Sequence, residues 1–372
     1  MEVYSTPCYI INKEQLLNNC KAIESPFLNY WGDNLILGYS IKTNNCDTII
    51  NILKERKWFA EVVSYDEYKL VKKKGYKACN IICNGPVKGK MLELAFKENA
   101  LINLDNLQEV YNICELWKKN PVKLINVGLR VNFNLDINCP GQKNAGEEIS
   151  RFGINYENGD IKRAIELLKA VGINVQGLHM HTSTKTRSLA VFKALSSKAA
   201  EIAKKYELDI KYVDIGGGFF GGQELAGKPK MEEYAMVISS ELRKYFSPDT
   251  VTLILEPGAS VVATAIDYLS TVQNVRNIEN ECIVTMDGTV LHINPFMVKR
   301  DSNMRIDIIQ QRERKEKQKI CGCTCMENDV FGLLENEYQL KIGDEIRFEN
   351  VGAYTVSFNS NFIIKKPLIY LE

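Results

Sequence analysis

The chain has 372 residues, 45% hydrophobic and 25% charged, and its net charge of +1 creates no overall field that would favour nucleic acid or an anionic membrane as a partner. No apolar run approaches the roughly 18 residues of a membrane-spanning helix, and the opening MEVYSTPCYIINKEQ lacks the basic and apolar regions of a secretory signal. Its eleven cysteines, which have no repeated spacing, are expected to be reduced thiols of a cytoplasmic protein.

Short apolar segments rich in β-branched residues recur through the first 260 residues, and helical stretches with apolar residues at i, i+3 and i+4 lie between them. In chain order, the predicted strands are residues 35–43, 59–64, 80–85, 100–105, 125–132, 174–182, 210–218 and 252–259. Strands that alternate with helices pair in parallel, and eight such units predict an α/β fold of the (β/α)8 TIM-barrel type. An open, doubly wound sheet is the alternative.

The pattern changes after Val261, where antiparallel strands broken by Asp-Gly, Gly-Asp and Asn-rich turns are expected. The N-terminal CYIINKE could add a strand to the same domain, since the barrel strands are already accounted for. We therefore expect a barrel at residues 25–262 and a β-sandwich or β-barrel-like domain formed by residues 1–24 and 263–372. The charged run at 310–319 is expected to be a solvated loop or an edge.

Reactive or unusual residues close four of the predicted barrel strands, at the end where barrel enzymes have their active sites. They are Lys42, the pair His179 and His181, the run Gly216–Gly218, and Glu256. Lys42 ends an apolar strand, so desolvation could make its amine nucleophilic enough to form a Schiff base. The glycines expose backbone N–H groups and suit a phosphate.

Some of these motifs also admit other interpretations. Residues 216–221 fit G-x-G-x-x-G, but no acid closes a following strand about 20 residues on, as a dinucleotide site requires. His179 and His181 point to one face of a strand and resemble half a metal site, yet no spacing identifies carboxylates to complete it. The CGCTC run at 321–325 has no second cysteine pair to complete a zinc site. We expect neither a nicotinamide or flavin nor a metal.

The chain resembles the alanine-racemase-fold, or fold type III, decarboxylases, which include ornithine, diaminopimelate and carboxynorspermidine decarboxylases. The resemblance covers nearly the whole chain and keeps the family's order of motifs. The matching segments are STPCYIIN, YSIKTN, SRFGI, GLHMHTST, DIGGGF, EPGAS, CTCMENDVF and GAYTVSFNSNF. It implies a homodimeric amino-acid decarboxylase that uses pyridoxal 5′-phosphate.

The resemblance also implies roles for individual residues. Lys42 would carry the cofactor as a Schiff base, His181 would stack on its ring, and Glu256 would keep the ring nitrogen protonated. Cys325, a proton donor, and Asp329 beside it would come from the second subunit. The other cofactor residues would be Glu61 near the Schiff base, Arg130, and the phosphate ligands Thr184, Gly216, Gly217, Gly218 and Tyr354.

The chain departs from the family at positions that contact the substrate or the phosphate. Ala259 replaces an arginine that is a phosphate or a substrate contact in relatives, Met326 replaces an acid that meets a distal amine, and Asn294 and Val298 stand in place of an Arg-Pro-x-x-Tyr stretch. Because a buried distal charge needs a partner, we expect meso-diaminopimelate and free L-ornithine to be poor substrates. The candidate substrate residues are Asn294, Met326, Asp329 and His292; Lys185, Arg187, Lys299 or Arg300 could replace the missing charges.

Two other functions fit the same fold. An amino-acid racemase or epimerase is one, but racemases of this fold place an arginine, not a residue like Glu256, at the ring nitrogen. A non-catalytic relative is the other, and the retention of Lys42, Glu256 and Cys325 together argues against it.

Overall fold

The computed structural model describes residues 4–121, 126–143, 149–279, 281–297, 302–306, 312–359 and 361–372. Contacts within the chain divide it into two compact units. The barrel unit is Cys20–Ser260, and the β unit is Met1–Asn19 together with Val261–Glu372. The domain boundaries expected from the sequence, residues 24/25 and 262/263, remain a prediction.

The barrel unit contains a closed ring of eight parallel strands, which confirms the expected barrel and excludes the open sheet. The ring consists of β2 (Leu35–Ser40), β3 (Phe59–Val62), β4 (Ile81–Cys83), β5 (Leu101–Leu104), β6 (Asn126–Asn132), β8 (Gly177–His179), β9 (Tyr212–Asp214) and β10 (Thr252–Leu255). Pairing of β10 with β2 and of β5 with β6 closes the ring. A short strand, β7 (Ile154–Asn155), pairs with β6.

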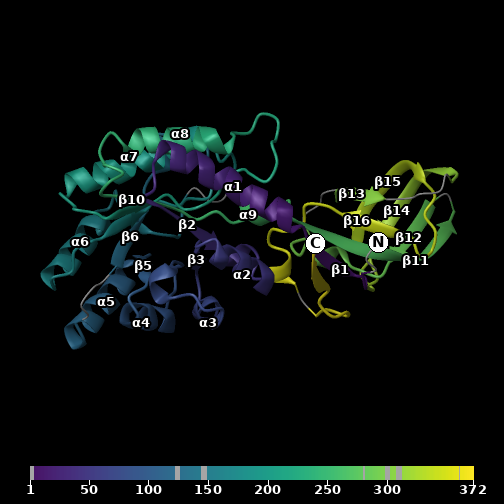
Figure 1. Ribbon diagram of the computed structural model, residues 1–372, viewed down its shortest axis with the longest axis horizontal. Coiled ribbons are helices and arrows are strands. Elements are labelled where there is room, and N and C mark those ends of the chain that lie inside the picture. The colour runs from purple at the N-terminus through teal and green to yellow at the C-terminus, as the bar shows by residue number, and fades with distance from the viewer. Residues whose placement is uncertain are drawn as a thin grey trace. The chain divides into compact units, whose positions relative to one another are not determined.

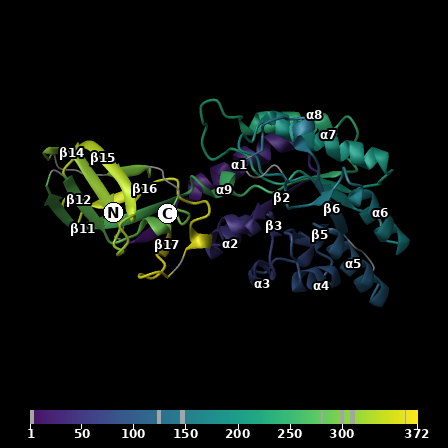
Figure 2. The ribbon, with the colours of Figure 1, turned by 180° about the vertical axis from the view of Figure 1, so that it is seen from behind.

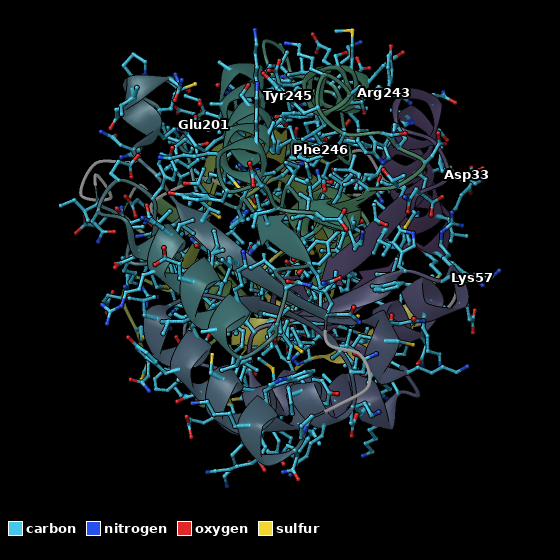
Figure 3. The ribbon with its side chains drawn as sticks, turned by 90° about the vertical axis from the view of Figure 1, so that its left-hand side faces the viewer. Asp33, Lys57, Glu201, Arg243, Tyr245 and Phe246 are labelled. Carbon is cyan, nitrogen blue, oxygen red and sulfur yellow. The ribbon has the colours of Figure 1, made fainter. Side chains whose placement is uncertain are left out.

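Helices follow the barrel strands and surround them (Figure 1; seen from behind in Figure 2). They are α1 (Lys13–Tyr30), α2 (Asp47–Glu55), α3 (Tyr65–Lys73), α4 (Lys90–Lys97), α5 (Leu107–Lys119), α6 (Asp160–Ala170), α7 (Leu189–Lys205), α8 (Met231–Leu242) and the short α9 (Ala259–Val262). Ser64 and Asn106 begin α3 and α5, because each side-chain oxygen accepts a hydrogen bond from a backbone N–H in the first turn. Figure 3 labels Asp33 and Lys57, which precede β2 and β3 at the opposite strand ends from Lys42 and Glu61.

One large side chain in the barrel interior, that of Tyr212, packs over two glycines. A Cβ on Gly128 would lie 2.1 Å from the Tyr212 hydroxyl, and one on Gly177 would lie 2.3 Å from its ring. The ring packs with Ile82, Leu101 and Ile254 in a buried apolar cluster. The absence of two side chains therefore makes the room that the Tyr212 ring occupies.

The β unit is an eight-stranded sheet that includes the N-terminal strand, as expected. Its strands are β1 (Cys8–Ile11), β11 (Ile266–Ile278), β12 (Glu281–Met286), β13 (Met304–Ile306), β14 (Arg314–Cys321), β15 (Val330–Tyr338), β16 (Glu345–Phe348) and β17 (Leu368–Leu371). The order is β13-β16-β11-β12-β14-β15, and β1 pairs with both β11 and β17. Two pairings, β1 with β17 and β12 with β14, are parallel, so the sheet is mixed instead of purely antiparallel.

The prediction that residues 310–319 form a solvated loop or edge is wrong for the part that the structure describes. Residues from Arg314 onward form β14, which lies between β12 and β15. Gln318 and Ile320 are fully buried, while Lys315 and Lys317 lie opposite glutamates of β15. Paired charges on one face and buried residues on the other allow a charged segment to form an interior strand.

No helix in the described ranges combines the length and apolar character that a membrane crossing needs. All eleven cysteines lie in described residues and are free thiols.

Candidate active site

Lys42 and Glu61 form an ion pair at the C-terminal ends of β2 and β3. Lys42 lies in the single turn Ile41–Thr43 directly after β2, and its Nζ is 2.6 Å from Glu61 Oε2 and 2.7 Å from Ser40 Oγ. Ser40 Oγ in turn donates to Glu61 Oε2. The Glu61 side chain is 1% exposed, whereas that of Lys42 is 42% exposed. The expected desolvation of Lys42 is therefore not present: a buried carboxylate fixes an amine that solvent still reaches.

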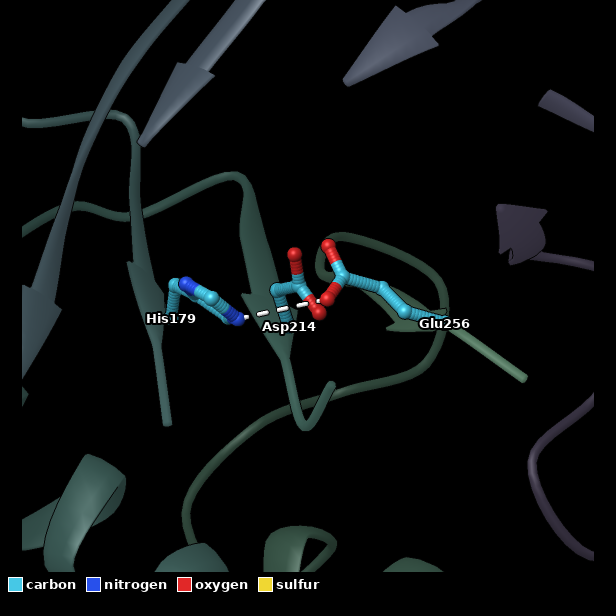
Figure 4. Close-up of side chains that lie close together, drawn as sticks. All are labelled: His179, Asp214 and Glu256. Carbon is cyan, nitrogen blue, oxygen red and sulfur yellow. Dashed lines mark ion pairs between the residues drawn. The ribbon is translucent and has the colours of Figure 1, made fainter. Parts of the chain in front are cut away.

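A second carboxylate, Glu256, follows β10 and lies among polar side chains inside the barrel (Figure 4). Its Oε2 is 3.3 Å from His179 Nε2, and its Oε1 accepts a 2.5 Å hydrogen bond from Asn84 Nδ2. Although burial opposes its charge, His179 and a hydrogen bond with Asp214 hold the pKa of Glu256 below its usual value. Burial and the neighbouring Glu256 raise the pKa of Asp214 well above its usual range. The two carboxyl groups are therefore coupled, and their surroundings favour negative charge on Glu256 over negative charge on Asp214.

His179, Asp214 and Glu256 offer ligand atoms within 4.8 Å of one another, so a metal site has to be considered. The oxygens of the two carboxylates, however, already face N–H donors from Asn84, Asn103 and the Gly216 backbone. The His179–Glu256 contact has an ion-pair distance without hydrogen-bond geometry. N–H hydrogens directed at these oxygens occupy positions that a cation would need, and the absence of a metal remains a prediction.

The glycine run after β9 forms a turn against His181. Gly216 has φ +72°, and a Cβ there would lie 2.5 Å from His181 Cβ. The Gly217 N–H points at His181 Nδ1 at 3.3 Å, and a Cβ on Gly217 would lie 2.2 Å from the Glu256 carbonyl oxygen. Gly218, with φ +93°, faces open space. Close packing on one side and an open backbone on the other make this turn a suitable anion cradle.

His181 itself lies beyond β8, in the following loop, and is partly buried. Burial, together with the nearby Arg130 and His179, lowers the pKa of His181 to about 3. It is therefore a neutral ring near neutral pH, able to stack on another flat group. Its ring is parallel to that of His179, with the two centroids 6.2 Å apart.

Arg130, at the end of β6, connects this region to a cavity. Its Nη1 donates to Asp105 Oδ1 at 3.0 Å, and its guanidinium lies 4.8 Å from the centre of the Phe152 ring. A cavity of about 1110 Å³ has Arg130, Phe152, His181 and Thr182 among its lining residues. The cavity thus opens beside two of the predicted cofactor residues. Thr184 lies in the same loop as His181, where its Oγ1 accepts from the Arg187 N–H.

In the β unit, Asp329 organises the loop that carries Cys325. Its Oδ1 accepts from Thr289 Oγ1 and the Val290 N–H, and its Oδ2 accepts from the N–H and Oγ1 of Thr324. A Cβ on Gly322 would lie 2.2 Å from the same carboxylate. Asp329 is 2% exposed, whereas Cys325 is exposed. A buried carboxylate with four donors thus presents an outward thiol, with Met326 partly buried beside it.

The remaining predicted residues of the β unit have different environments. His292 is 2% exposed and its Nδ1 is 2.7 Å from the Tyr268 hydroxyl, so a substrate would reach it only after local rearrangement. Asn294 is also buried. Tyr354 is 39% exposed with φ +60°, a backbone strain that proteins concentrate at functional sites. Val298, Lys299 and Arg300 lie outside the described residues.

Sequence reasoning missed Asn84, Asn103 and Asp214, which cross-link the predicted residues. Asp214 alternates with Tyr212 and Gly216 on one face of its strand, and that face points into the barrel. The sequence could have indicated these residues through their polarity at inward positions of buried strands, because a buried polar group needs a hydrogen-bond partner.

Comparisons with known proteins agree with this geometry. A family model, the pyridoxal binding domain of pyridoxal-dependent decarboxylases, matches residues 18–263. The diaminopimelate decarboxylase of Methanocaldococcus jannaschii is 27% identical over 376 residues, covering 97% of this chain and 84% of that protein.

Solved structures give the same family and fold. A structure of the M. jannaschii enzyme in complex with L-lysine has a TM-score of 0.85 at 26% identity, covering 99% of this chain and 87% of that one. The arginine decarboxylase of Paramecium bursaria Chlorella virus, bound to agmatine, has a TM-score of 0.80 at 20% identity, covering 99% and 96%, and supports the fold alone. The chain belongs to the pyridoxal-dependent decarboxylase family, and it is an amino-acid decarboxylase that uses pyridoxal 5′-phosphate.

Proposed function

We propose that this enzyme decarboxylates an amino acid whose side chain ends in a neutral, acylated or otherwise extended group. The observation that carries this proposal is the neutrality of Ala259, Asn294 and Met326, at positions where relatives place charged or multiply hydrogen-bonding groups. A free distal carboxylate or ammonium ion would lack a partner there, and an unpaired buried charge is strongly unfavourable. Meso-diaminopimelate is the competing candidate, because curated relatives are named for it.

The described residues of the barrel unit fit the cofactor. Bound pyridoxal phosphate supplies a sink for the electron pair left on the α-carbon when CO₂ departs. Lys42 Nζ would hold the cofactor covalently, and Glu61 and Ser40 keep that nitrogen in place. Glu256, whose charge His179 and Asp214 favour, would keep a proton at the ring nitrogen.

The phosphate and the ring need contacts of other kinds. Gly216, Gly217 and Gly218 offer a turn with an open backbone, and neutral His181 offers a flat face for stacking. Thr184 and Tyr354 are the further phosphate ligands of this proposal. Arg130, held by Asp105, contributes a fixed positive charge at the mouth of the barrel.

The proton that replaces CO₂ on the α-carbon is assigned to Cys325 Sγ of a second subunit. Support comes from the exposure of Cys325 on a loop fixed by Asp329. A homodimer with shared sites follows from this assignment, and a cytoplasmic location is a separate part of the proposal. Mixing inactive Lys42→Ala and Cys325→Ala proteins should then restore part of the activity. No recovery after verified subunit exchange would exclude shared sites.

The two alternatives are a racemase or epimerase and a non-catalytic homologue. The ionised Glu256 favours a protonated cofactor ring and hence decarboxylation over racemisation. The Lys42–Glu61 pair keeps the amine in place for covalent attachment, which a non-catalytic protein does not require. A colourless purified protein that does not take up pyridoxal phosphate would support the non-catalytic reading.

Steady-state kinetics test the substrate. We expect a CO₂-release screen of L- and D-amino acids, diamino acids and their acylated derivatives to favour the acylated or neutral ones. For meso-diaminopimelate and L-ornithine, kcat/KM should stay below about 10⁴ M⁻¹s⁻¹, the low end for ordinary enzymes. Values at or above that limit would show that the neutral positions were misread. Met326→Asp is the matched variant, because a new acid should raise kcat/KM for L-ornithine selectively.

A further inference from the structure

A single amide joins the two functional carboxylates of the barrel. Asn84 directly follows β4 and is 3% exposed. Its Nδ2 donates to Glu61 Oε1 at 3.1 Å and to Glu256 Oε1 at 2.5 Å. Glu61 is the partner of Lys42, and Glu256 is the residue assigned above to the cofactor ring nitrogen. Both hydrogens of one NH₂ group are thus given to two buried carboxylates.

The orientation of this amide is fixed by a directed chain of hydrogen bonds. The Tyr212 hydroxyl donates to Asn103 Oδ1 at 2.8 Å, and Asn103 Nδ2 donates to Asn84 Oδ1 at 3.0 Å. Burial, with Asp214 and Glu256 nearby, raises the pKa of Tyr212 well above its usual value, so its hydroxyl remains a donor. With the opposite orientation, Asn84 would direct its carbonyl oxygen at two carboxylates. Each hydrogen bond in such a chain polarises the next, which strengthens the two bonds that Asn84 donates to Glu61 and Glu256.

We propose that Asn84 is a positioning residue that couples the Glu61 carboxylate to the Glu256 carboxylate, so that a change of charge at one is felt at the other. The inference rests on the proposed roles of the two glutamates and extends them. The amine that holds the cofactor and the carboxylate that serves its ring then form one electrostatic unit. Neither Ser40 at Glu61 nor His179 at Glu256 provides this link, because each contacts one of the two carboxylates.

The first test follows the pH at which the loaded enzyme loses its cofactor. Asn84→Ala removes both donors, and Asn84→Asp replaces the amide with an acid of the same shape. A carboxylate that loses a charge-assisted hydrogen bond takes up a proton at higher pH. Visible absorbance follows the acid limb of cofactor retention, that is, the loss of bound cofactor as the pH is lowered. The midpoint pH of this limb should therefore increase by about one unit or more in Asn84→Ala, and further in Asn84→Asp.

The matched control is Asn19→Leu, which removes a similarly buried amide from the β unit, where Asn19 Nδ2 donates to the Val261 carbonyl oxygen. It should lower stability but leave the acid limb unmoved. Should neither Asn84 variant fold, Tyr212→Phe removes the first donor of the chain and must move the limb in the same direction, by less. A limb that stays in place in the folded variants would overturn the proposal.

The second test needs no cofactor, so it separates this inference from the proposed function. Urea unfolding of the cofactor-free protein is compared in two double-mutant cycles, Asn84→Ala with Glu61→Gln and Asn84→Ala with Glu256→Gln. Coupling to both carboxylates should make the effects non-additive in both cycles. Additivity in either cycle would overturn the bridge, whereas a failure to bind pyridoxal phosphate would overturn only the proposed function.

Discussion

The two units hold their functional groups in opposite ways. In the barrel unit, Glu61 and Glu256 are buried and connected through Asn84, and the exposed amine of Lys42 is fixed by one of them. In the β unit, Cys325, the proposed proton donor, is exposed, and the base of its loop is anchored through Asp329. Barrel substitutions should therefore change the chemistry directly, whereas β-unit substitutions should act through the placement of a loop.

Lys42→Ala, in the barrel unit, should have the largest effect of these substitutions on turnover. Without the amine there is no covalent attachment, so turnover should fall by several orders of magnitude and borohydride should fix no cofactor to the protein. Mass spectrometry of the reduced adduct of the wild-type protein checks the assignment. A label on any other lysine would contradict it.

Glu256→Gln should retain the cofactor but lose about a hundredfold or more in kcat. The neutral amide cannot keep the ring nitrogen protonated, although its size is almost unchanged. Parallel measurement of kcat and of the cofactor dissociation constant separates the two effects. An unaltered kcat would make this glutamate purely structural.

Asp329→Asn tests whether the β unit acts through loop placement. An amide in place of the carboxylate keeps one accepting oxygen but turns N–H groups against two of the four donors, so the loop should loosen. We expect kcat to fall by about tenfold, a smaller loss than the general acid–base contribution itself, with cofactor affinity unchanged. The alkylation rate of Cys325 should change in parallel, and Cys325→Ala gives the reference loss. If cofactor affinity fell instead, Asp329 would belong to the cofactor site.

The smallest expected effect is on folding stability at low pH, and it comes from His292, which is buried in the β unit. Burial lowers the pKa of His292 to about 4, although Asp329 opposes the shift. The unfolded chain takes up a proton below about pH 6.5 while the folded β unit does not, so the free energy of unfolding decreases as the pH is lowered, by about 1.5 kcal/mol between pH 6.5 and 5. His292→Gln should remove this loss, measured by amide hydrogen exchange in β11 and β16. Equal acid sensitivity in the variant would show that His292 is not its source.

Much of the barrel could be predicted from the sequence, because eight apolar segments alternate with helices and such segments pair in parallel. The strand ends could not. Residues 174–182 were expected to form one strand, but β8 covers Gly177–His179 and leaves His181 in the loop, where it packs on Gly216. The spacing of apolar residues predicts that a strand is present. It does not show at which residue the backbone hydrogen bonds of that strand end, because side-chain packing determines the structure from there.

The roles of individual site residues remain predictions, and the missed residues have a physical reason. Asn84, Asn103 and Asp214 come from positions up to 130 residues apart, and which inward side chains meet depends on how the strands are staggered around the closed barrel. The exposure of Lys42 depends likewise on the turn after β2, which hydrophobic pattern does not reveal.

The packing of Tyr212 against Gly128 and Gly177 has an evolutionary consequence. Neither glycine can gain a side chain while the ring is present, and a smaller residue at 212 would leave a void above both glycines. Single changes at any of the three positions are therefore unfavourable, and Gly128 is held further by Asn103 Oδ1 and the Gly177 carbonyl oxygen, which a Cβ there would approach to 2.8 and 2.9 Å. Positions 177 and 212 should covary among relatives, with the ring lost before Gly177 is replaced, while Gly128 should stay constant.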